Sequence, residues 1–243
     1  MQRKLNSYVK YQQSKLSSRE KAVVLVSGGM DSALTAAIAS KKHELLLLHA
    51  NYGQRTEKRE LKAFTYIAQH YKAKKTLVVD LSHLKKIGAS SLTDMTIEVS
   101  KADLKSREVP SSYVPFRNAN LLASAVSWAE AEGAKKIFIG AVEEDSSGYP
   151  DCRRSFFDSY ERMIKLGTNK GTNIRIITPI INLSKKDIVR KSLQMKVPLE
   201  LTWSCYKSSS KACGECDSCA LRLRGFRLAG AEDRIPYAKR PVY

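Results

Sequence analysis

Short apolar runs alternate with segments of helical periodicity along most of this chain. Each run is rich in aliphatic or β-branched residues and is bounded by turn residues, as the buried strands of a parallel sheet are. The predicted strands lie at 21–26, 44–49, 76–80, 135–140 and 173–178. The predicted helices lie at 33–40, 55–71, 118–132, 151–166 and 184–194. This alternation predicts an α/β fold: a doubly wound parallel sheet of about five strands, with ligands at the carboxyl ends of the strands.

The pattern divides the chain into four regions. The α/β domain is expected over 21–200, preceded by a polar, basic arm at 1–20. A cysteine-rich region follows at 201–230 and a tail at 231–243. Within the domain, the stretch 82–112 has no clear periodicity, so we expect an irregular excursion over the sheet edge. Long irregular segments of this kind often cover a functional site.

The chain is strongly basic. Its 42 lysines and arginines against 24 aspartates and glutamates give a formal net charge of +18. A positive surface attracts nucleic acid, but it also attracts ATP and acidic small molecules. The basic residues are spread along the chain without an aromatic-interleaved basic motif, so direct nucleic-acid binding is not favoured. No apolar run is long enough to span a membrane and no hydrophobic signal core is present, which indicates a cytoplasmic protein.

The sequence Ser-Gly-Gly-Met-Asp-Ser at 27–32 joins the first predicted strand to the first predicted helix. This strand–turn–helix arrangement presents several backbone N–H groups to one anion. The two glycines let the backbone approach a phosphate closely, and the two serines add hydroxyl donors. Asp31 is interpreted either as a helix cap or as a ligand on the magnesium side of a phosphate. The alternative for the whole segment is a capped glycine turn that binds nothing.

Four of the five cysteines gather near the C-terminus, at Cys205, Cys213, Cys216 and Cys219. The last three are spaced so that they can turn around one metal ion. Four thiolates suit a tetrahedral structural Zn²⁺ with no open coordination position. An iron–sulfur cluster is the main alternative, and disulfides are less favoured because a cytoplasmic chain keeps its thiols reduced. We therefore predict a small C-terminal zinc-binding knob that unfolds when zinc is lost.

The fifth cysteine, Cys152, lies apart in the sequence Ser-Gly-Tyr-Pro-Asp-Cys-Arg at 147–153. A catalytic thiol is one interpretation. A small buried cysteine beside a substrate loop is the commoner case and is the one we prefer.

Several of these segments together resemble a known family. The loop at 27–32 lacks the ending of a Walker loop and is similar to the pyrophosphate loop of the PP-loop ATP pyrophosphatases, whose fold is adenine nucleotide α-hydrolase-like. Together with the cysteines and this loop, four more segments resemble the 7-cyano-7-deazaguanine synthases: 51–55, 114–118, 147–153 and 201–206. The resemblance runs from about Lys21 to about Arg227.

Three departures from the family pattern accompany this resemblance. Met30 stands where glutamine is common, Phe116 where glycine is common, and Glu-Glu-Asp at 143–145 where Glu-Thr-Asp is expected. They bear more on the identity of the substrate than on the ATP chemistry.

The resemblance implies an ATP-dependent ligase that makes the nitrile precursor of queuosine and archaeosine. ATP, with Mg²⁺, adenylates the carboxylate of 7-carboxy-7-deazaguanine, because a carboxylate is a poor electrophile and AMP is a good leaving group. Ammonia then forms an amide, and a second activation with loss of AMP gives the nitrile. The resemblance further implies small-molecule substrates and a homodimer.

The resemblance also assigns roles to residues. ATP is expected to contact the loop and its flanks: Val26, Ser27, Gly28, Gly29, Met30, Asp31, Ser32, Ala33 and Leu34. The expected catalytic residues are Asp31, Arg117 and Lys185, although Lys185 reads equally as a solvated lysine and Arg117 equally as a surface salt-bridge partner. The expected substrate contacts are Arg55, Arg117, Asn118, Asp151 and Arg153. Asp151 is expected to read the guanine-like edge, because a carboxylate accepts two N–H bonds, with helix capping as its alternative.

Two other functions remain as alternatives. A PP-loop enzyme acting on tRNA, of the thiolase or lysidine type, would use the positive charge, but a thiolase usually needs a pair of catalytic cysteines. A non-catalytic zinc-containing module would keep only the nucleotide pocket, and the intact loop at 27–32 argues against it.

Overall fold

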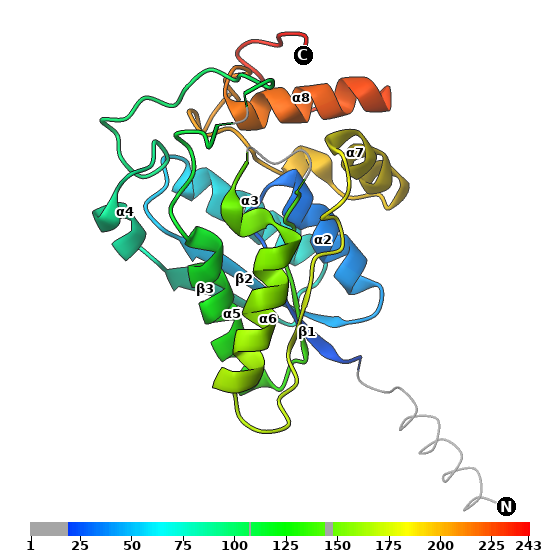
Figure 1. Ribbon diagram of the computed structural model, residues 1–243. Helices are drawn as coiled ribbons and strands as arrows, with labels where there is room; N and C mark the ends of the chain where they lie inside the picture. The colour runs from blue at the N-terminus through cyan, green and yellow to red at the C-terminus, as the bar shows by residue number, and fades with distance from the viewer. Residues whose placement is uncertain (1–18, 107, 144–147) are drawn as a thin grey trace, which may run out of the picture.

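The computed structural model describes residues 19–106, 108–143 and 148–243. At its centre is a parallel sheet with the strand order β3-β2-β1-β4-β5 (Figure 1). The strands are β1 (Lys21–Leu25), β2 (Glu44–Asn51), β3 (Lys75–Asp80), β4 (Lys136–Phe138) and β5 (Arg175–Ile177). The prediction of a five-stranded, doubly wound sheet is confirmed. Most of the basic arm predicted at 1–20 lies outside the described residues. Residues 144–147 also lie outside them, so the segments 143–145 and 147–153 are described only in part.

Strand β1 is the middle of the sheet. Its Val23 pairs with Leu46 of β2 on one side and with Ile137 of β4 on the other. Alternate side chains of β1 enter different cores, since Val24 packs in the cluster on one face and Val23 in the cluster on the other. Both faces of the sheet are therefore buried, which explains why its strands read as continuous apolar runs.

Helices cover both faces of the sheet (Figure 1). One face packs against α2 (Met30–Ser40), α3 (Glu57–His70) and α7 (Lys185–Gln194). The other face packs against α5 (Arg117–Glu132) and α6 (Arg154–Gly167). Half of the residues that helix α2 buries are alanines, and their small side chains let this helix pack close to the sheet.

Three stretches differ from the sequence-based prediction. Helix α2 begins at Met30 rather than at 33, so half of the predicted loop is already helical. The helix predicted at 151–166 is a 3₁₀ turn (Pro150–Cys152) followed by α6, because Arg153 between them is extended. The described residues of the excursion, 82–106 and 108–112, are irregular as predicted, apart from the short helix α4 (His83–Ile87).

The C-terminal region packs onto this domain. A 3₁₀ turn (Leu199–Leu201) leads to the cysteines, and α8 (Asp217–Ala229), which was not predicted, lies across α7 (Figure 1). The core of the knob combines the cysteines with Trp203, with Ala63 of α3 and with Val99 of the excursion. No helix in the described ranges is both long and apolar enough to cross a membrane.

Candidate active site

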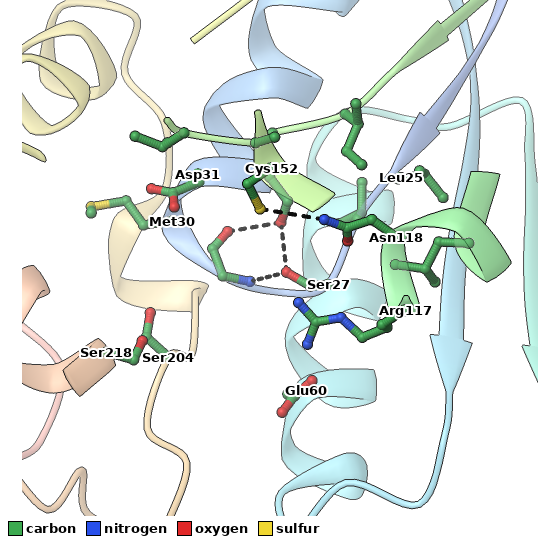
Figure 2. A pocket seen from close by; sticks show the side chains of 18 of the residues that line it. Leu25, Ser27, Met30, Asp31, Glu60, Arg117, Asn118, Cys152, Ser204 and Ser218 are labelled. Atoms are coloured by element: carbon green, nitrogen blue, oxygen red, sulfur yellow. Dashed lines mark hydrogen bonds between the residues drawn. The ribbon is translucent and has the colours of Figure 1, made fainter. Parts of the chain in front are cut away.

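A cavity of about 270 Å³ lies at the carboxyl ends of β1, β2 and β4 (Figure 2). Strands β1 and β4 are neighbours, and the chain order runs outward from them in opposite directions. Such a switch point is where doubly wound sheets bind their ligands. Many of the predicted site residues line this cavity: Val26, Ser27, Gly29, Met30, Asp31, Ser32, Arg117, Asn118 and Lys185.

Gly28 makes the turn from β1 into α2. Its φ is +94°, and a Cβ at this position would lie 2.7 Å from the backbone oxygen of Glu60. Only glycine combines this backbone conformation with so close an approach. The Gly28 carbonyl oxygen in turn accepts a 2.8 Å hydrogen bond from the backbone N–H of Trp203. The loop is thus held between α3 and the segment that leads to the cysteines.

The two loop serines are hydrogen-bonded within the loop (Figure 2). The Ser27 hydroxyl donates to the Ser32 hydroxyl at 3.3 Å and accepts from the Gly29 N–H at 3.3 Å. Ser32 donates to the Gly29 carbonyl at 2.9 Å. These short-range bonds keep both hydroxyls and the Gly29 N–H together at the cavity wall, so a phosphate that replaced the internal bonds would meet several donors in one place.

The first turn of α2 carries the main electrostatic feature of the loop. Gly29 is the N-cap residue, and no side chain caps the helix. The positive end of α2 is therefore left available for an anion. Asp31 is therefore not the helix cap, and that interpretation is wrong. Its Oδ2 instead lies 2.5 Å from Nζ of Lys185. Its Oδ1 is buried without a hydrogen-bond partner in the described structure, which fits a magnesium-side ligand.

Lys185 reaches the loop from the first position of α7. Its side chain is 11% exposed, so it is not the solvated lysine that was its alternative interpretation. Gly140, just after β4, allows this crowding of elements, because a Cβ there would lie 2.9–3.0 Å from Thr35 Oγ1 and from the Asp31 backbone.

Arg117, the first residue of α5, also lines the cavity. Phe116 before it has the left-handed φ of +55°, which explains why glycine is common at this position in the resembling family. The Arg117 guanidinium donates to the Tyr52 hydroxyl at 3.2 Å and lies 5.5 Å from the centre of that ring. Burial by itself would lower the pKa of Arg117, but the surrounding tyrosine oxygens and Asp151 outweigh it, so the arginine stays charged.

Asn118 and Asp151 are bonded to each other. The Asn118 backbone N–H donates to Asp151 Oδ2 at 2.9 Å, and its side-chain amide donates to the Asp151 carbonyl at 3.0 Å and to Cys152 Sγ at 3.3 Å. Asp151 is 3% exposed and lies outside the cavity lining. Burial raises the pKa of Asp151 and raises the pKa of the Cys152 thiol to about 11, so Cys152 is protonated at neutral pH, as its preferred structural interpretation requires.

The remaining predicted residues lie away from the cavity lining. Arg55 donates to the carbonyls of Ser91, Asp94 and Ile97 and so braces the excursion. Arg153 is exposed at the start of α6. Of the predicted ATP contacts, Gly28, Ala33 and Leu34 lie behind the cavity wall.

Several cavity residues were missed by the sequence analysis: His49, Glu60, Tyr149, Trp203, Ser204, Tyr206, Ser218 and Arg222. Glu60 carried a detectable signal. It lies four residues before Phe64 and seven before Ile67, so it is an acidic residue on the apolar stripe of a helix. Burial raises the pKa of Glu60 against the effects of its hydrogen-bond donors and of Arg117.

The four C-terminal cysteines form one cluster. Their sulfurs all lie within 4.8 Å of one another, and the Cys213 and Cys219 sulfurs are 3.9 Å apart. A tetrahedral zinc ion with Zn–S bonds of 2.3 Å holds its sulfurs about 3.8 Å apart, so the donor set fits a single Zn²⁺. An iron–sulfur cluster would separate the sulfurs more widely, because each would bind a different iron atom or share one with a single neighbour.

Backbone donors favour thiolates in this cluster. Cys205 Sγ accepts N–H groups from Lys207, Ser208 and Cys213, at 3.3–3.4 Å. Cys216 is the N-cap of α8, so the positive helix end also faces the sulfurs. All five cysteines are free of disulfides.

Comparisons with known proteins agree with this geometry. A profile of the family described as "Queuosine biosynthesis protein QueC" matches residues 21–230. The chain belongs to this family. Relatives include the 7-cyano-7-deazaguanine synthases of Chlorobium phaeobacteroides, 57% identical over 92% of this chain and 99% of the relative, and of Chloroherpeton thalassium, 58% identical with the same coverage. The predicted resemblance is confirmed, and with it the prediction of a ligase of queuosine biosynthesis, a pathway in which the QueC family uses ATP.

Solved structures of lower identity are also similar to the chain. They include NMN synthetase from Francisella tularensis, 15% identical with a TM-score of 0.44 over 82% of this chain and 71% of that one. NAD⁺ synthetase from Burkholderia pseudomallei is 12% identical with a TM-score of 0.44 over 95% and 80%.

Proposed function

We propose that the chain converts 7-carboxy-7-deazaguanine and ammonia to 7-cyano-7-deazaguanine, with two activations by ATP. The observation that carries this proposal is one cavity that joins an uncapped helix start, the Asp31–Lys185 pair and the charged Arg117. An adenylating enzyme needs donors for a pyrophosphate and a separate positive group for a carboxylate. This cavity offers both.

The loop and α2 are proposed to bind the phosphates of ATP. The N–H groups at the start of α2, together with the hydroxyls of Ser27 and Ser32, are placed to receive the β- and γ-phosphates. Lys185 Nζ adds a positive charge at the point where the pyrophosphate leaves, and preorganised charge of this kind lowers the barrier to phosphate-bond cleavage. Asp31 Oδ1 is the ligand offered to Mg²⁺, whose contribution when bound is to neutralise charge on the phosphate oxygens.

Arg117 is proposed to hold the substrate carboxylate for its attack on the α-phosphorus of ATP. A buried guanidinium orients a carboxylate by paired hydrogen bonds, and the surrounding tyrosines exclude water from the acyl-adenylate. Ammonia then displaces AMP from the acyl-adenylate and gives the amide. A second adenylation, on the amide oxygen, lets AMP leave as the nitrile forms. Of the predicted substrate contacts, Asn118 is the neighbour best placed to assist, while Arg55, Asp151 and Arg153 support the surrounding segments.

The zinc ion is proposed to be structural. Four thiolates leave no coordination position for chemistry, and reduced cysteines suit the cytoplasmic location predicted from the sequence. The homodimer also stays a prediction, which size-exclusion chromatography with light scattering decides.

Mass spectrometry of the products tests the proposal. Purified protein is mixed with ATP, Mg²⁺, ammonium and 7-carboxy-7-deazaguanine, and we expect the nitrile with two AMP per nitrile formed. Consumption of ATP without nitrile would favour another PP-loop reaction, such as one on tRNA. No AMP at all from folded, zinc-loaded protein would contradict the enzymatic function.

A further inference from the structure

The cavity contains an acidic side chain that the proposed chemistry does not use. Glu60 of α3 lines the same cavity as Arg117 of α5, and Figure 2 shows both side chains near the loop. The positive charge of Arg117 acts on the Glu60 carboxylate, yet no ion pair joins these two described side chains. A carboxylate and a guanidinium that face one cavity without neutralising each other are suited to a ligand that has donors and acceptors side by side.

The Glu60 carboxylate is held in place by two other side chains. Oε1 accepts a 2.7 Å hydrogen bond from the Thr56 hydroxyl, and Oε2 accepts a 3.2 Å hydrogen bond from the Gln54 amide. Thr56 is itself tied to the Cys205 carbonyl oxygen at 3.2 Å. An ionised carboxylate has about four acceptor positions, so one on each oxygen is left for a ligand. Two parallel acceptor positions match two neighbouring N–H donors.

A 7-carboxy-7-deazaguanine ring presents this pattern along one side. The carboxylate and O6 are adjacent acceptors, and N1–H and the 2-amino group follow as adjacent donors. A cation beside a carboxylate is complementary to this order. Asp151, which was predicted to read the guanine-like edge, lies outside the cavity lining and is bonded to Asn118. Glu60, unlike Asp151, lines the cavity, and Asp31, the other acid of the lining, is paired with Lys185.

We propose that Glu60 accepts hydrogen bonds from N1–H and the 2-amino group of the deazaguanine ring, while Arg117 beside it donates to O6 and to the carboxylate. Glu60 is then the residue that distinguishes a 2-amino ring from one without the amino group. This inference rests on the proposed function, because it names how that substrate is recognised.

Kinetics with two substrates test the inference. The first is 7-carboxy-7-deazaguanine and the second is its analogue without the 2-amino group, 7-carboxy-7-deazahypoxanthine. We expect the wild-type chain to prefer the first by about 10- to 100-fold in kcat/KM, since a buried acceptor left without its donor is costly. In Glu60→Gln we expect KM for the first substrate to rise by about 10- to 100-fold, KM for ATP to stay unchanged, and the preference to shrink to within about threefold.

Glu57→Gln is the matched control. Glu57 lies one turn earlier on α3, accepts from the Gly53 N–H at 3.1 Å and is outside the cavity lining, so this variant should keep the wild-type preference. A Glu60→Gln variant with unchanged KM and preference would overturn the inference while nitrile formation still supported the proposed function. The comparison of the two substrates with wild type does not depend on the folding of any variant. Active wild type that used both substrates equally would also overturn the inference. Wild type without nitrile synthesis would remove both proposals together.

Discussion

Lys185 Nζ lies 2.5 Å from Asp31 Oδ2, although the two residues are 154 positions apart. The contact joins the first residue of α7 to the first turn of α2. The start of α2 is positive by its dipole, so the Asp31 carboxylate lies at one positive helix end and contacts the Lys185 ammonium group. This arrangement holds one carboxylate oxygen in place and leaves Oδ1 facing a buried position without a partner in the described structure.

The first prediction concerns this pair. Because both groups act at the same phosphate, Lys185→Gln and Asp31→Asn should each lower kcat by about 10²–10³-fold, and the double variant should be little worse than the poorer single variant. Steady-state measurement of nitrile and AMP checks this, with Lys186→Gln as the neighbouring control. Fully multiplicative losses in the double variant would show that the two groups act separately.

The second prediction concerns the cysteine cluster. Cys205 is two residues after Trp203, whose N–H holds the Gly28 carbonyl, so loss of zinc should disturb both the knob and the ATP loop. We expect Cys205→Ser to lose zinc, to lower Tm by about 10 °C and to weaken ATP binding. Metal analysis, thermal melting and nucleotide titration measure the three effects.

Cys152→Ser is the control for that variant, because it removes a cysteine outside the cluster. It should keep one zinc per chain. ATP affinity that survived zinc loss would show that the Trp203–Gly28 contact does not transmit the change.

The third prediction concerns stability of the C-terminal segment. The side chains of Arg222 and Asp233 are 2% and 1% exposed and pair at 2.6 Å. Since Asp233→Ala would leave a buried guanidinium without its counter-charge, it should lower the free energy of unfolding by about 3–5 kcal/mol. Chemical denaturation measures this. The neighbouring pair Glu232–Arg240 is exposed, so Glu232→Ala should cost no more than about 1 kcal/mol; equal losses in the two variants would contradict the argument.

The fourth prediction concerns Cys152. Burial raises the pKa of its thiol to about 11, so the thiolate fraction is small at pH 7 and grows about tenfold per pH unit up to that value. The rate at which iodoacetamide alkylates Cys152, followed by peptide mass spectrometry, should therefore be low at pH 7 and rise about tenfold per pH unit. Cys152→Ala should keep activity within about threefold. Fast labelling at pH 7 would revive the catalytic interpretation.

Local signals were sufficient for much of the fold. Apolar runs located the strands because a strand buried on both faces of a sheet, as β1 and β2 are, must be apolar along most of its length. The N-terminal loop was recognisable because its glycines and serines lie within six residues, and the metal ligands because Cys213, Cys216 and Cys219 are close in sequence. Helix α8 was missed because its face toward α7 contains few apolar residues and its buried Arg222 reads as a surface charge.

The sequence by itself determined the five strands, most of the helices, the loop that suits a phosphate and the four thiol ligands, since each depends on residues near one another in the chain. The tertiary structure alone decided which distant side chains meet. Sheet order and helix packing bring Asp31 to Lys185, bond Asp151 to Asn118 and place Glu60 in one cavity lining with Arg117. The physical reason is that one cavity collects the ends of three strands and residues from five helices, and no local pattern records which of their charged groups will share it.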